Sequence, residues 1–184
     1  MISLSAFIHL QVHSSYSLLT STIKIEDLVK KAKESNFDAI ALTDRNVMYG
    51  TVAFYKECLK HGIKPIIGLT VDVVEEIDGE KLGPLVLLAI NNEGFKNLMK
   101  ISSAVQTKSP QGIPLKWLRH YAVGLYALTP GMEGKIEQAL LNNEPEVANR
   151  TLKMLADLFG ENRFYLSIQN QGLSGQVELV ERLA

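Results

Sequence analysis

Apolar and polar positions follow two alternating periods along the chain. Short runs rich in apolar and β-branched residues predict six strands: Phe7–His13, Asp38–Thr43, Lys64–Val74, Pro84–Ile90, Gly124–Thr129 and Arg163–Gln169. Segments with apolar residues at helical spacing predict helices between them: Lys24–Ser35, Thr51–His61, Asn92–Gln106, Lys116–Tyr121, Glu133–Leu141, Glu146–Phe159 and Ser174–Leu183. Strands that alternate with helices in this way favour a parallel α/β sheet or barrel.

Two segments refine this pattern. The pair Asp78-Gly79 is typical of a tight turn, so the strands on either side of it are expected to form a hairpin. The helix Thr51–His61 is expected to end at Gly62, a residue suited to the left-handed position after a helix. It presents three apolar residues on one side: Val52, Tyr55 and Leu59. About six strands are too few for a closed eight-fold barrel, so we expect this chain to be part of a longer protein.

Composition places the chain among ordinary globular proteins. Its 184 residues, 46% of them hydrophobic, are enough for one core, and we expect one domain over residues 1–184. A formal net charge of −1 gives no support for strong DNA binding, because phosphate contacts require a basic excess. The one cysteine, Cys58, is expected to be a buried thiol and fits a reducing cytoplasm. Neither a signal peptide nor a membrane span is indicated, so a cytoplasmic location is expected.

Histidines and a glutamine end the first predicted strand. His9, Gln11 and His13 alternate, so a regular strand would place their side chains on one face. Two histidines at i and i+2 could share a metal ion, but these two are at i and i+4, about 13 Å apart along an extended strand. The residues are therefore either part of a metal site completed from elsewhere or polar groups at the mouth of a barrel.

Asp44 and Arg45 follow the second predicted strand. Asp44 could meet His13 or could cap a turn before Asn46, and both readings stay open. Arg45 carries a permanent positive charge and only donates hydrogen bonds, so it cannot ligate a cation and would repel one. Its guanidinium could hold a phosphate or pair with Asp44, and the adjacency of the two residues leads us to predict that pair.

The order of these segments resembles a known family. The resemblance rests on residues Phe7–Leu19, Ala39–Asp44, Tyr49-Gly50, Phe54–Lys56, Gly62–Gly68, Leu85–Ala89, Asn97-Leu98, Ile101–Ser103, Gly124–Thr129 and Phe164–Asn170. Together they resemble the PHP (polymerase and histidinol phosphatase) domain at the N-terminus of bacterial DNA polymerase III alpha subunits. Among these subunits, the segments resemble those of the DnaE-type polymerases of Gram-positive bacilli.

The resemblance implies a distorted (βα)7 barrel, here incomplete at its C-terminus, with a trinuclear metal site in the metal-binding members. His13 and Asp44 match two ligand positions of that site, and His9 matches a family position outside the paired histidines. Five other ligand positions are replaced by residues that ligate poorly or cannot ligate: Gln11, Arg45, Thr70, Pro84 and Gln171. Two remaining ligands are too few for a working site, so we expect no catalytic residue and no bound metal or other cofactor in this chain.

The implied function is that of a catalytically silent structural and partner-binding module in the polymerase of DNA replication. The parent chain would be a DNA-directed DNA polymerase, a nucleotidyltransferase that uses Mg²⁺ in a domain outside this sequence. Expected partners are the remainder of the polymerase chain and other replisome subunits, with weak or no DNA contact by this domain and no membrane contact. The alternative is an active metal-dependent phosphoesterase or 3′–5′ proofreading exonuclease. Direct template contact through Lys96, Lys100 and Lys108 is a third possibility.

Overall fold

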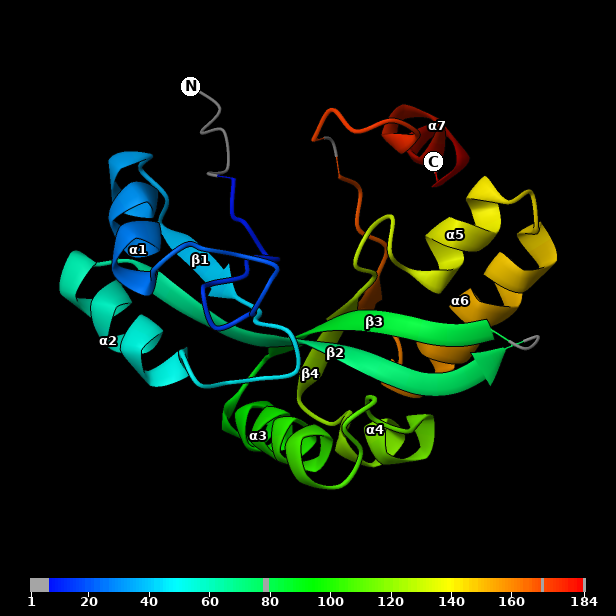
Figure 1. The fold of residues 1–184 in the computed structure, drawn as a ribbon, viewed down its shortest axis with the longest axis horizontal. Helices are drawn as coiled ribbons and strands as arrows, with labels where there is room; N and C mark the ends of the chain where they lie inside the picture. Colours follow the sequence, from blue (N-terminus) through cyan, green and yellow to red (C-terminus); the bar gives the residue numbers. More distant parts are fainter. Residues whose placement is uncertain (1–6, 78–79, 170, 184) are drawn as a thin grey trace.

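A computed structural model describes residues 7–77, 80–169 and 171–183, and Figure 1 shows their arrangement. The elements follow the predicted order, with most boundaries within about three residues: α1 (Ile25–Glu34), β1 (Ala39–Leu42), α2 (Thr51–His61), β2 (Lys64–Ile77), β3 (Glu80–Ala89), α3 (Asn92–Thr107), α4 (Leu115–Tyr121), β4 (Leu125–Leu128), α5 (Lys135–Leu141), α6 (Pro145–Phe159), β5 (Phe164–Tyr165) and α7 (Gln176–Leu183). None of the helices in these ranges is long and apolar enough to cross a bilayer.

The described strands form one mixed sheet in the order β1-β2-β3-β4-β5. The β1–β2 and β4–β5 pairs are parallel, whereas β2–β3 and β3–β4 are antiparallel. The predicted hairpin is therefore confirmed as β2–β3, and its expected turn, Asp78-Gly79, lies outside the described residues. Parallel pairs therefore occur only at the two ends of the described sheet. The hairpin between β2 and β3 reverses the chain direction, so β3 runs antiparallel to both of its neighbours.

The expected first strand, Phe7–His13, is not formed. This segment lies beside β1, but its hydrogen bonds are uneven: the Ala41 amide donates to the His9 carbonyl and the Thr43 amide to the Val12 carbonyl. The interval from His9 to Val12 is therefore one residue longer than the interval from Ala41 to Thr43 that it pairs with, as in a β-bulge. The Thr43 hydroxyl also accepts from the Val12 amide, so a side chain takes the place of a ladder partner.

The expected strand Arg163–Gln169 is shortened to the two residues of β5. Its ladder with β4 covers Ala127↔Phe164 and Leu128↔Tyr165, and the Thr129 amide then donates to the Tyr165 carbonyl. Beyond that point the Ser167 amide donates to the Thr129 hydroxyl at 2.9 Å instead of to a strand carbonyl. Side-chain competition therefore ends this strand early, as it does the first.

Three groups of buried side chains hold the layers together. The largest joins β2, β3 and β4 to α3, α4, α5 and α6, and the second joins β1 to α1 and α2. Figure 1 shows α1 and α2 at one end of the sheet and α5 and α6 at the other. A small third group joins Ala41 of β1 to Val86 and Leu88 of β3. Arg45, just beyond the end of β1, bridges Thr70 in the middle of β2.

Helix α2 has the predicted bounds and ends at Gly62, whose φ of 67° is left-handed as expected. Cys58 is buried, also as expected. The apolar side formed by Val52, Tyr55 and Leu59 is nevertheless exposed, while the helix packs on the core through Thr51, Phe54 and Cys58.

Candidate functional site

Asp44 leaves the end of β1 and closes a turn of the N-terminal segment. Its buried carboxylate accepts hydrogen bonds from the Ser14 amide (2.7 Å), the Ser14 hydroxyl (2.7 Å) and the Ser17 hydroxyl (2.6 Å). The Ser17 hydroxyl oxygen in turn accepts from the Arg45 amide at 3.0 Å. Charge-assisted hydrogen bonds of this kind are stronger than neutral ones. Asp44 therefore holds the segment from Ser14 to Ser17 in place. It caps a turn that precedes it in the chain, not one before Asn46.

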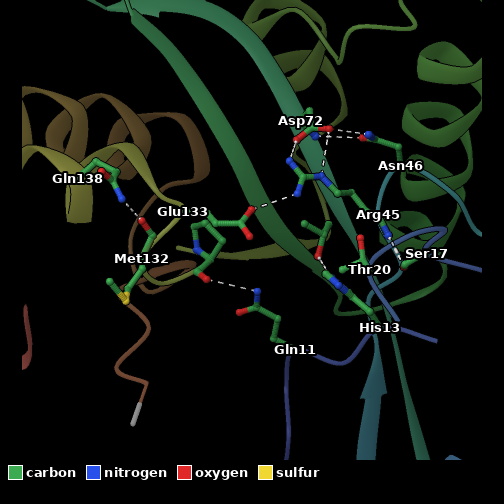
Figure 2. Close-up of polar contacts among 12 residues, drawn as sticks. Gln11, His13, Ser17, Thr20, Arg45, Asn46, Asp72, Met132, Glu133 and Gln138 are labelled. Atoms are coloured by element: carbon green, nitrogen blue, oxygen red, sulfur yellow. Dashed lines mark hydrogen bonds and ion pairs between the residues drawn. The ribbon is translucent and has the colours of Figure 1, made fainter. Parts of the chain in front are cut away.

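Arg45 does not pair with Asp44, so that prediction is wrong. Its guanidinium donates from Nη2 to Oδ1 of Asp72 at 2.7 Å and from Nε to Oδ2 of Asp72 at 3.2 Å. Its Nη1 donates to Oε2 of Glu133 at 3.0 Å. Figure 2 shows the guanidinium between the two carboxylates, which come from β2 and from the loop before α5. The hydrogen bonds to Asp72 and the negative charges of Asp72 and Glu133 raise the pKa of Arg45 above its ordinary value.

Asn46 completes the contacts of Asp72. Its side-chain Nδ2 donates to Oδ2 of Asp72 at 2.6 Å, and the Asp72 amide donates to Oδ1 of Asn46 at 3.0 Å. Asn46 adopts a left-handed φ of 61°, a conformation that asparagine tolerates better than most residues. The Asp72 side chain thus receives three hydrogen bonds, two from Arg45 and one from Asn46, which satisfies most of what a carboxylate can accept.

His13 faces Thr70 on the neighbouring strand β2. The distance between Nε2 of His13 and Oγ1 of Thr70 is 3.1 Å, and the threonine is buried. Burial lowers the pKa of His13 below its ordinary value, and the charge of Arg45 lowers it as well, against the opposing effect of Asp44 and Glu133. Burial thus favours the neutral form of the imidazole, one nitrogen of which is hydrogen-bonded to the threonine hydroxyl.

Gln11 bridges the N-terminal segment and the segment after β5. The side chain of Gln169 donates from Nε2 to Oε1 of Gln11 at 2.9 Å and to the Pro130 carbonyl at 3.2 Å. Nε2 of Gln11 donates to the same carbonyl at 3.4 Å. Two amides therefore bond to each other and to one backbone oxygen, at a position where the resemblance implies a metal ligand.

The other three expected positions lie outside this network. The ring of His9 packs edge-on against Phe7 and Phe37, so the common face expected for His9, Gln11 and His13 does not form. Pro84 is buried opposite Asp72 in the β2–β3 register. Gln171 is exposed, and its backbone amide donates to the Gln176 side chain at the start of α7.

This donor set does not fit a metal ion. Within the described ranges, no three or more histidine, cysteine, aspartate or glutamate side chains gather closely enough to hold one. The two carboxylates that converge here, Asp72 and Glu133, converge on a guanidinium. A cation that cannot ligate therefore occupies the centre of the site and compensates its negative charge.

Comparison with known proteins decides the family. A model of the PHP domain matches residues 9–171. The chain belongs to the PHP domain family. It is 46% identical over 176 residues to the DNA polymerase III subunit alpha of Bacillus subtilis, covering 94% of this chain and 16% of that protein. The same subunit of Halalkalibacterium halodurans is 38% identical over 179 residues, covering 96% of this chain and 16% of that protein.

The PHP domain of this chain thus spans about a sixth of the polymerase subunits that it matches. Among solved structures, an amidohydrolase from Chromobacterium violaceum is similar with a TM-score of 0.45 and 17% identity, over 83% of this chain and 50% of that one. The resemblance drawn from the sequence, to the PHP domain of polymerase III alpha subunits, is confirmed.

Four residues of the network were not anticipated from the sequence: Asn46, Asp72, Glu133 and Gln169. Asp72 left a usable signal, because Thr70 and Asp72 are polar at alternate positions of an otherwise apolar strand and so share a face. Glu133 and Gln169 left none, since each lies in a segment whose position depends on the whole fold.

Proposed function

We propose that this PHP domain works without a metal ion, as a structural and partner-binding module of a DNA polymerase III alpha subunit. The observation that carries the proposal is the position of Arg45, whose guanidinium lies between Asp72 and Glu133. Hydrolysis of a phosphoester by a metal centre requires ions that polarise the phosphate and activate water. A fixed guanidinium supplies charge but no site for a metal-bound hydroxide.

The five described strands would form part of a (βα)7 barrel that is completed by further segments of the parent polymerase. The strand β5, which ends the described sheet with two residues, supports this, because an edge strand leaves backbone groups free to pair with a further strand.

Polymerase activity is proposed for the parent protein alone, with Mg²⁺ held by residues outside this chain. The partners would be the rest of the polymerase and other replisome subunits, in the cytoplasm. Weak or no DNA binding by the domain follows from its balance of 19 basic and 20 acidic residues.

A phosphoesterase assay tests the proposal. Purified protein would be incubated with Mn²⁺, Zn²⁺ or Mg²⁺ and either a chromogenic phosphomonoester or a 3′-labelled primer strand. We expect no turnover above that of a heat-denatured sample with any of the ions. Metal-dependent release of phosphate or of the 3′ nucleotide would instead establish the phosphoesterase or exonuclease alternative.

A further inference from the structure

Basic side chains gather on helices α3 and α4. Between Asn92 and Tyr121 the chain carries five lysine or arginine residues and one acidic residue, Glu93, so this segment has a formal charge of +4 in a chain of −1 overall. Figure 1 shows α3 and α4 on the same side of the sheet, and the two helices contact each other. The near-neutral net charge of the chain therefore conceals an uneven distribution of charge.

The α3–α4 basic face, as we call it, consists of four exposed cations: Lys96, Lys100, Lys116 and Arg119. Lys96 and Lys100 are one turn apart on α3, so their side chains share a face of that helix. Nζ of Lys100 lies 5.7 Å from the centroid of the Tyr121 ring at the end of α4, and this ring contacts the His120 ring edge-on. Lys116 is one turn before His120 on the same face of α4. These contacts connect the cations of both helices into one row.

No acidic side chain neutralises the basic face. Within the described parts of the chain, none of its four cations takes part in an ion pair. Glu93, the acidic residue of these two helices, lies in the first turn of α3 and is not paired with them. The face therefore presents uncompensated positive charge, which attracts a polyanion.

The exposed side chains of the face distinguish a nucleic acid from an acidic protein. Interfaces between proteins are centred on apolar or aromatic anchors that become fully buried. Among the described side chains of α3 and α4, Met99 is the one large apolar group that is exposed, at 41%. Contacts with phosphates require no such anchor, because their affinity comes from charge neutralisation and the release of counterions. The composition of the face thus favours a nucleic acid.

The aromatic rings of α4 distinguish double-stranded from single-stranded nucleic acid. Proteins that bind single strands offer exposed rings on which the bases stack. Trp117 and Tyr121 are instead half-buried and packed against the main core, and Lys100 lies over the ring of Tyr121. These two rings are therefore not available to bases. A row of cations without a stacking platform suits the phosphates of a duplex, which contact proteins without exposing the bases.

We propose that the α3–α4 basic face contacts the phosphate backbone of duplex DNA, in the form of the primer–template on which the parent polymerase acts. The inference rests on the proposed function, since it gives the metal-free domain a place on the substrate of the parent protein. Four phosphate contacts alone bind DNA weakly at physiological salt, so the face adds to the affinity that other parts of the parent protein supply. The face is separate from the network of Arg45, Asp72 and Glu133.

The salt dependence of DNA binding by the full-length protein tests this proposal. One variant combines Lys96→Gln, Lys100→Gln and Lys116→Gln, and the matched control combines Lys24→Gln, Lys30→Gln and Lys33→Gln, three exposed lysines of α1 and its N-terminal flank. Fluorescence anisotropy of a labelled primer–template duplex gives Kd over a range of salt concentrations. On a logarithmic plot, the binding constant falls with salt by about 0.9 for each phosphate contact. We expect the slope of the α3–α4 variant to be smaller by about 2–3, and its Kd at about 0.15 M salt to be about tenfold higher.

The control variant should match the natural protein in both slope and Kd. At low salt and saturating DNA, both variants should extend a primer as fast as the natural protein, which shows that they are folded. An unchanged slope and Kd in the α3–α4 variant, an equal change in the control, or an equal loss of affinity for a single strand would each overturn the proposal. Such a result would leave the metal-free function standing, because that function is tested separately by phosphoesterase activity and metal content.

Discussion

Arg45 binds Asp72 with two nitrogen atoms, although 26 residues separate them in the chain. The geometry follows from the strand register: Arg45 forms a parallel bridge with Thr70, and Asp72 is two residues further along the same face of β2. A bidentate guanidinium–carboxylate pair fixes orientation as well as charge. Together with the contacts of Glu133 and Asn46, this pair occupies carboxylate oxygen atoms that would otherwise be available to bind a metal ion.

The Asp72→Asn substitution should destabilise the fold by about 1–2 kcal/mol. It removes the charge that Arg45 pairs with and weakens two hydrogen bonds, although partial exposure of both side chains reduces the loss. Glu133→Gln is the matched control, because Glu133 is 67% exposed and should cost less than about 1 kcal/mol. Urea unfolding gives both free energies. Equal effects of the two substitutions would show that Asp72 is not the principal partner.

Asp44→Asn should cost more, about 2–4 kcal/mol. The buried carboxylate accepts two hydrogen bonds at Oδ1, from the Ser14 amide and the Ser17 hydroxyl, and one at Oδ2, from the Ser14 hydroxyl. An amide nitrogen at the Oδ1 position would face the Ser14 amide, which can only donate, and at the Oδ2 position it would require the Ser14 hydroxyl to reorient and accept. Asp38→Asn, an exposed aspartate just before β1, serves as the control and should change the free energy of unfolding by less than about 0.5 kcal/mol. An Asp44 variant as stable as this control would rule out the role of Asp44 in fixing the turn.

Glu137 should make stability depend on pH. This side chain of α5 is completely buried, and burial raises its pKa from 4.5 to about 7. A carboxyl with a raised folded-state pKa contributes stability below about pH 4.5 and loses it as the pH rises through 7, because the folded state then binds more protons than the unfolded chain. Between pH 4.5 and pH 8 the loss should be at most about 3 kcal/mol.

The neutral variant Glu137→Gln isolates this effect. The difference in unfolding free energy between the variant and the natural protein should move in favour of the variant as the pH is raised from 5 to 8. Chemical denaturation at several pH values measures it. A difference that stays constant over this range would mean that Glu137 is ionised throughout or that its pKa is unchanged by folding.

Sequence reasoning found the order of elements because helical and strand periods are local properties. It also recognised Arg45 as incompatible with a cation, since this follows from the chemistry of guanidinium alone. The partner of Arg45 could not be predicted in this way. Adjacent side chains point in different directions on an extended chain, so Asp44 is not the partner. Asp72 is brought to Arg45 by the pairing of the two chain segments at Thr70.

Two further differences have the same origin. His9, Gln11 and His13 alternate in the sequence, but the uneven pairing with β1 prevents their side chains from sharing one face. Helix α2 has two apolar sides, and periodicity does not say which of them faces the core. Both outcomes depend on tertiary contacts that the spacing of residues in the sequence does not encode.

Metal content distinguishes a metal-free domain from one with a metal centre. Elemental analysis would be made on untagged protein purified in the presence of Mn²⁺ and Zn²⁺, beside a variant in which Gln11→His, Arg45→His, Thr70→Glu, Pro84→His and Gln171→His are combined. We predict less than about 0.1 metal equivalent per chain in the natural protein, because Arg45 supplies the positive charge between Asp72 and Glu133. Two or three equivalents of metal per natural chain would contradict it.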